Sequence, residues 1–163
     1  EKNNLISQSK QFDEISNEIK NNFTYCWYYF FEFIFIFTNR WKKQVGDLEI
    51  FSVGMVIMWH SLVKKSYQEN GWNFSNWKKN KIKVPETGVN TMSISEITNI
   101  PRPTVVRKLN YLLKNKYISV NKKKLFNVNM QDKTLTDTIK LQEKNVISLA
   151  HLVFKIFHQI NIK

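Results

Sequence analysis

Residues Ser93 to Val128 have the sequence SISEITNIPRPTVVRKLNYLLKNKYISVNKKKLFNV, which is the most informative segment for the fold. Its apolar spacing and its prolines predict a short helix, a tight turn, a second helix and a hairpin, in that order. The first helix has a start signal, because Ser93 can cap it while Glu96 reaches back to the free amide of Ser93. The buried edge of this helix is expected to consist of Ile94, Ile97 and Ile100.

Two prolines predict the turn that follows. Pro101 lacks an amide hydrogen and disfavours helical geometry at Ile100, so the chain is expected to turn between Asn99 and Pro103. Pro103 suits the first position of a new helix. In that second helix three apolar residues recur at spacings of four and three and therefore share the face that packs on the first helix. They are Val105, Leu109 and Leu112.

A hairpin is predicted after the second helix. Residues 117–120 favour a strand, residues 121–124 a turn, and residues 125–128 a returning strand, although the turn lacks an Asn-Gly or Asp-Gly pair. The tip carries three adjacent lysines, which suit a phosphate backbone or the edge of a minor groove.

The charged residues between Ile97 and Gln131 are all basic. Between Ile97 and Gln131 there is no Asp or Glu, whereas the cations are Arg102, Arg107, Lys108, Lys114, Lys116, Lys122, Lys123 and Lys124. Such a local excess is the electrostatic footprint of nucleic-acid binding. The net charge of +12 over 163 residues is weaker evidence, because an AT-rich genome would give any protein a similar bias toward Lys, Asn and Ile.

The order of helix, turn, helix and hairpin is that of the winged helix-turn-helix of DNA-binding proteins. A recognition helix meets base edges mainly near its N-terminus. Arg107 is suited to a bidentate contact with guanine, and Thr104 or Val106 to a thymine methyl group. The expected DNA-binding residues are Arg102, Thr104, Val106, Arg107, Lys108, Tyr111, Lys122, Lys123 and Lys124. The alternative is an amphipathic helical hairpin with a solvated basic face.

The most apolar segment is FTYCWYYFFEFIFIF, residues 23–37. It is too short for a membrane span, which needs about 20 apolar residues, and it contains Glu32. We expect a helix buried across a subunit interface, with a strand as the alternative. The polar start of the chain does not fit a secretory signal, and the single cysteine, Cys26, suits a reducing cytoplasm, where we expect the protein.

The remaining segments are predicted to be mostly helical. Asp47 is expected to cap a helix that runs to about Tyr67 and is apolar nearly all round, as a central helix is. A C-terminal seam with spacings of four and three predicts packing on another helix, most economically from a second subunit. Its members are Leu135, Ile139, Gln142, Val146, Leu149, Val153, Ile156 and Ile160.

The expected fold is mainly α with a small β-hairpin wing. Residues 1–69 are assigned to N-terminal helices for dimerisation and core, and residues 70–91 to a long loop. Residues 92–130 form the winged helix-turn-helix lobe that binds DNA, and residues 131–163 the C-terminal dimerisation helix.

This helix order resembles the MarR family of bacterial transcriptional regulators, most clearly over residues 92–128. The resemblance implies a homodimer whose terminal helices interlock, a pseudo-palindromic DNA site, and a small ligand that weakens DNA binding. The chain departs from the family in its long 70–91 loop and in a short wing without the Asp-x-Arg pattern. Lys116 also stands where a glycine is usual, leaving Asn115 or Lys116 to adopt the left-handed helix cap.

No catalytic motif is found. The four glycines are isolated, and the spacing of the histidines does not suit a chelating pair, so neither an enzyme nor a metal or other cofactor is expected. An apolar pocket for a small aromatic effector can be drawn from Tyr28, Phe31, Trp41 and Trp59, with His60 or Tyr29 as a polar contact, although a packed core explains the same aromatics.

Three functions therefore remain open. The first is a dimeric regulator that binds duplex DNA, and the second is a protein-interaction adaptor on the same fold. The third is a peripheral membrane protein anchored by residues 23–37.

Overall fold

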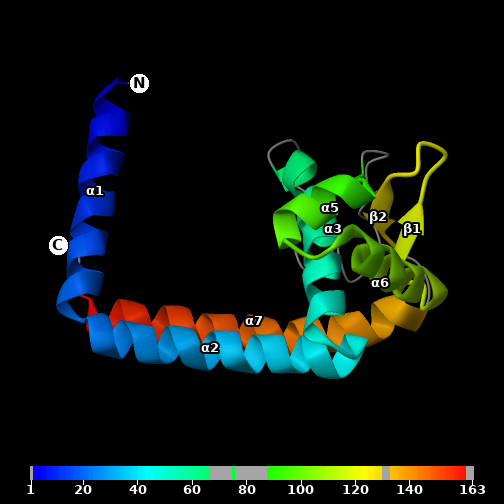
Figure 1. The fold of residues 1–163 in the computed structure, drawn as a ribbon. Coiled ribbons are helices and arrows are strands. Elements are labelled where there is room, and N and C mark those ends of the chain that lie inside the picture. The colour runs from blue at the N-terminus through cyan, green and yellow to red at the C-terminus, as the bar shows by residue number, and fades with distance from the viewer. Residues whose placement is uncertain (1, 67–74, 76–87, 130–132, 161–163) are drawn as a thin grey trace. The chain divides into compact units, whose positions relative to one another are not determined.

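The computed structural model describes residues 2–66, 75, 88–129 and 133–160, which are mainly helical with a small two-stranded antiparallel sheet (Figure 1). The chain divides into two compact units, residues 1–39 with 142–163, and residues 40–141. The coarse fold class expected from the sequence is confirmed. Most of the predicted 70–91 loop, residues 70–74 and 76–87, lies outside the described residues.

The first unit is built from long helices. Helix α1 spans Lys2–Asn21, α2 spans Phe23–Val45, and α7 spans Lys133–Gln159. The aromatic segment is thus helical, and the strand alternative was wrong. The early part of α2 and the late part of α7 run side by side (Figure 1), where the Gln159 side-chain amide donates to Asn22 Oδ1 over 3.2 Å. Apolar groups buried in this unit are Cys26, Leu152 and Ile160.

Helix α3, Leu48–Ser66, is the centre of the second unit. It contacts three elements, α5 (Thr91–Thr98), α6 (Arg102–Lys114) and strand β2 (Phe126–Val128), as expected for a helix that is apolar nearly all round. The predicted cap is confirmed, because the Ile50 amide donates to Asp47 Oδ1 over 2.7 Å. The best-buried apolar side chains of this unit are Val53, Ile57, Ile94, Val105, Leu109 and Leu112.

Helix α5 begins earlier than predicted. Its N-cap is Asn90, whose side chain accepts the Ser93 amide over 2.9 Å, so Ser93 is inside the helix and is not the cap. An Asn oxygen satisfies a free amide as well as a Ser oxygen does, and Asn90 is held in place by the residue before it, which pairs with β2. Ile94 is fully buried as expected, but Ile97 is 47% exposed and does not belong to the buried edge.

The turn between α5 and α6 follows the prediction closely. Asn99 takes the left-handed conformation, with φ of 54°, and Pro101 stands directly before α6. The second helix begins at Arg102, one residue before the predicted Pro103. Either position is compatible with proline, since the first amides of a helix have no partner within it.

The predicted hairpin is confirmed. Strand β1, Ile118–Val120, pairs antiparallel with β2, so that Ile118 lies opposite Val128. Asn121 organises the connection, because its side-chain oxygen accepts the backbone amides of Lys123 and Leu125, each over 3.0 Å. Lys116 adopts the left-handed conformation expected of it or its neighbour, with φ of 58°.

Candidate nucleic-acid interface

Helix α6 separates apolar and basic side chains by face. Val105, Leu109 and Leu112 are buried in the unit. Arg102, Val106 and Arg107 are exposed, and Thr104 is half-buried between the two faces. The residues expected to meet bases therefore lie on or beside the accessible side of the helix, near its N-terminus.

The two arginines are unengaged within the part of the chain that the structure describes. Neither guanidinium makes a hydrogen bond or an ion pair there. No acidic residue follows Glu96 in this segment up to the end of β2. Arg102 and Arg107 are thus free to bind an anionic group without first breaking an internal contact.

The hairpin tip is a second basic surface. Lys122, Lys123 and Lys124 are all exposed. Lys124 has a left-handed φ of 57°, and its amide donates to the Asn121 carbonyl oxygen over 2.9 Å, which closes the turn. The turn chemistry comes from Asn121 and not from a glycine, which explains why the usual hairpin signal is missing from the sequence.

Lys108 does not lie on this exposed surface, contrary to its expected place among the DNA-binding residues. The residue is only 8% exposed. Its Nζ donates to Asp47 Oδ2 over 2.6 Å and lies 3.0 Å from Glu49 Oε2. The ammonium group therefore joins α6 to the start of α3 instead of pointing to solvent.

The ion pair shifts both titrating groups. Partial burial alone would raise the pKa of Asp47, but hydrogen bonds from Lys108 and the Ile50 amide outweigh it and leave that pKa below its ordinary value. The hydrogen bond to Asp47 raises the pKa of Lys108 above its ordinary value against an opposing effect of burial, and Glu49 adds to the increase. Both groups are therefore charged at neutral pH.

Tyr111 in α6 and Tyr117 after it both approach the turn between α2 and α3. The Tyr111 hydroxyl lies beside Gly46, 3.7 Å from where a β-carbon would stand, and Tyr111 as a whole is 39% exposed. The Tyr117 hydroxyl donates to the Gln44 carbonyl oxygen over 3.3 Å. Tyr111 is thus a part of this junction that still reaches the surface, where its predicted DNA contact is possible.

The effector pocket predicted from the sequence differs from the cavity in the described part of the structure. None of Tyr28, Phe31, Trp59 and His60 lines that cavity, and the first three are 57–61% exposed. Trp41 is buried and stacks on Phe51, with 5.9 Å between ring centroids, as the packed-core explanation expects.

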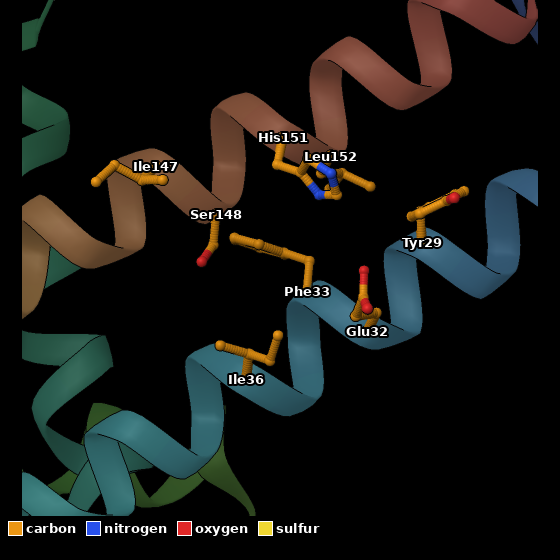
Figure 2. A pocket seen from close by; sticks show the side chains of 8 residues that line it. All are labelled: Tyr29, Glu32, Phe33, Ile36, Ile147, Ser148, His151 and Leu152. Carbon is orange, nitrogen blue, oxygen red and sulfur yellow. The ribbon is translucent and has the colours of Figure 1, made fainter.

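The described cavity lies in the first unit, between α2 and α7, and measures about 220 Å³ (Figure 2). Of the residues proposed from the sequence only Tyr29 contributes. Its ring meets the His151 ring at 77°, with 6.1 Å between centroids. The eight lining residues are Tyr29, Glu32, Phe33, Ile36, Ile147, Ser148, His151 and Leu152.

The described residues offer neither a metal site nor a membrane span. They hold no group of three or more His, Cys, Asp or Glu side chains placed to bind a metal ion. Across the same residues no helix is both long and apolar enough to cross a membrane. Cys26 is 2% exposed, and burial raises the pKa of its thiol, which keeps it unreactive.

Compared with protein-family models, curated proteins and solved structures, the chain has no match.

Proposed function

We propose that this chain binds duplex DNA in a sequence-specific manner, as a homodimeric transcriptional regulator of the MarR type with a winged helix-turn-helix. The observation that carries the proposal is the accessible face of α6, where Arg102 and Arg107 are exposed and unengaged among the described residues. A helix that offers arginines beside small side chains fits the major groove, where Arg reads guanine and Thr or Val meets thymine.

The lysines at the hairpin tip support the same function in a different way. Lys122, Lys123 and Lys124 are flexible point charges on a turn, which suits phosphate contacts that position a protein without reading sequence. The turn itself is fixed by hydrogen bonds to Asn121, so the three ammonium groups are presented together. Base contacts are assigned to α6 and backbone contacts to the tip.

A second copy of the chain is the proposed cover for the apolar surface of the first unit. Large apolar side chains are exposed along both long helices, among them Phe31, Phe35, Phe154 and Phe157. Monomeric proteins seldom expose large apolar patches to water, and a second copy would cover these side chains. On α7 the predicted seam is partly exposed, since Val146, Leu149 and Val153 are 45–51% accessible, which is what a helix awaiting a partner requires.

The experiment is a fluorescence-anisotropy titration after selection from a random duplex pool. We expect an enriched palindrome, and affinity that falls steeply as salt rises, because phosphate contacts release counterions. Arg107→Ala should weaken binding to the selected site by about 1–3 kcal/mol and relax its sequence preference. The matched control is Lys42→Ala, which removes one exposed charge from α2 and should leave sequence preference intact.

The second candidate is a protein-interaction adaptor, and one observation favours it. Met92, Ile97 and Val106 are 43–56% exposed on α5 and α6, an apolar set that a protein partner would cover. In that case the selection enriches no duplex, and Arg107→Ala changes nothing. Failure to bind any duplex at low salt therefore refutes the first proposal and leaves the adaptor.

A further inference from the structure

Glu32 is an uncompensated carboxylate in the most apolar part of the chain. It is half-buried and lines the cavity between α2 and α7. Within the described residues it has neither a hydrogen bond nor an ion pair. One helical turn away on α2 stand only uncharged residues, Tyr28, Tyr29, Phe35 and Ile36, so the usual pairing with a cation three or four positions away is not available.

The walls around this carboxylate are aromatic and aliphatic. Figure 2 shows Glu32 between Tyr29 and Phe33 on α2, with His151 and Leu152 on the facing α7. Desolvating an unpaired carboxylate is costly, and a ligand that brings a positive charge removes that cost. Aromatic faces also attract cations through their quadrupoles. The cavity therefore combines the two features by which proteins recognise organic cations.

One aromatic ring of the cavity already contacts a cation of the protein. The Lys155 ammonium lies over the Tyr29 ring, 5.4 Å from its centroid, and within the described residues it makes no ion pair with Glu32. Lys155 thus occupies the ring while the carboxylate beside it stays available. A cation therefore already lies against the Tyr29 ring in the folded protein.

We propose that this cavity binds a small organic cation, a monovalent amine or quaternary ammonium with an apolar body. The charged head lies against Glu32, and the apolar body packs among Phe33, Ile36 and Leu152. A volume of about 220 Å³ is below the range of drug-sized sites, which begins at about 300 Å³, so the ligand is small. Glu32 sets the charge preference of the cavity, so a cation should bind more tightly than an anionic aromatic compound of the same size.

The test is isothermal titration calorimetry of the full chain with benzyltrimethylammonium. We expect a Kd of about 1 mM or tighter, given the size of the probe. Benzoate, which has the opposite charge, and benzyl alcohol, which has none, should bind at least tenfold more weakly. Glu32→Gln keeps the shape and removes the charge, and it should weaken binding of the cation at least tenfold.

Two further variants serve as a control for net charge and as a test of the aromatic contact. Glu14→Gln removes an exposed carboxylate from α1 and should leave the Kd unchanged, which separates a local effect from a change in net charge. Tyr29→Leu removes the ring face and should weaken cation binding severalfold, with its fold checked by circular dichroism. The proposal is overturned if the cation does not bind, if benzoate binds as well, or if Glu32→Gln binds as tightly as the wild type.

This inference does not depend on DNA binding. The titration contains no DNA, and Arg107→Ala should bind the cation with an unchanged Kd. If the protein binds the cation but no duplex DNA, the proposed regulator is refuted and the proposed cation site stands. If it binds duplex DNA but not the cation, only the proposed cation site is refuted.

Discussion

Lys108 joins α6 to the start of α3 through two carboxylates. We expect Lys108→Met to lower the free energy of unfolding by about 1 kcal/mol at neutral pH, measured by urea denaturation. The loss is modest because the Asp47 and Glu49 side chains are 42% and 51% exposed and water can solvate them once the lysine is gone. Lys114→Met, at an exposed position of the same helix, is the control and should change stability little.

The effect of Lys108→Met should depend on pH. Because the pKa of Asp47 is lowered in the folded protein, its stabilisation is complete above the ordinary value of 3.8 and is lost as pH falls through the lowered pKa. The difference between wild type and Lys108→Met should therefore shrink in acid. Because the pKa of Lys108 is raised, the difference should persist to pH 10.5 and decline only above it.

Asp47→Asn separates the two roles of Asp47. Asparagine can still cap α3, since it accepts the Ile50 amide as aspartate does, but it carries no charge for Lys108. Asp47→Asn should lower the free energy of unfolding by less than Lys108→Met does, measured by the same urea denaturation. A decrease as large as that expected for loss of a helix cap would show that the two roles of Asp47 are not separable in this way.

The ion pair of Lys108 could not be predicted from the sequence. The sequence around it contains no acid, so a free cation was the natural expectation, yet its partner Asp47 is 61 residues away along the chain. By contrast, the cap at Asp47 and the left-handed Lys116 depend on adjacent residues and were predicted. Neighbouring residues were sufficient to predict the helix cap and the left-handed residue. They could not predict an ion pair between residues far apart in the sequence.

At the scale of elements, Gly88 allows the chain to lie against β2. A β-carbon there would stand 2.5 Å from the Phe126 carbonyl oxygen, closer than any real contact. Gly88→Ala should therefore push apart the pairing of Val89 with Phe126 and lower the free energy of unfolding by about 1–3 kcal/mol. Thermal denaturation followed by circular dichroism measures this change.

Gly54 provides the matched control. In the interior of α3 its added β-carbon would meet only Leu112 Cδ1 at 4.0 Å, an ordinary contact. Gly54→Ala should stabilise the protein by about 0.5–1 kcal/mol, because alanine loses less backbone entropy in a helix than glycine does. Equal effects at the two positions would contradict the close approach at Gly88.

Elements themselves were easier to predict than their ends. The apolar period of three and four residues, the prolines near Pro101 and the lysine-tipped turn were enough for α6 and the hairpin. The start of α5 was missed because Asn90 stands in a segment taken to be loop, and its capping geometry depends on the pairing of Val89 with β2. The aromatic content of residues 23–37 suited either helix or strand until the structure showed a helix.

At the scale of the whole molecule, the cavity could not be foreseen because it requires a register between two helices more than a hundred residues apart. From the sequence alone, Glu32 indicates only that residues 23–37 do not span a membrane. Its place opposite His151 and Leu152 follows from the antiparallel packing of α2 and α7 (Figure 2). The aromatic pattern indicated that a pocket was chemically possible, but it did not specify which rings line one.

The exposed apolar surface of these same helices leads to the last prediction, which concerns oligomeric state. A stable interface buries about 1,600 Å² in total. Phe35 and Phe157, which are 70% and 59% exposed, are suitable probes on α2 and α7. Sedimentation velocity should find a dimer for the wild type and a monomer for Phe35→Glu combined with Phe157→Glu, because a buried unpaired carboxylate costs several kcal/mol. Helical content should be retained.

Thr24→Glu adds a carboxylate at an exposed, polar position of α2 and should leave the dimer intact. A monomeric wild type would contradict the dimer, and flotation with anionic vesicles would then show whether the apolar surface meets lipid instead. If the dimer positions two copies of α6 on a palindrome, the monomeric variant should also lose far more affinity for the full site than for a half-site, since binding of the second copy is no longer linked to the first.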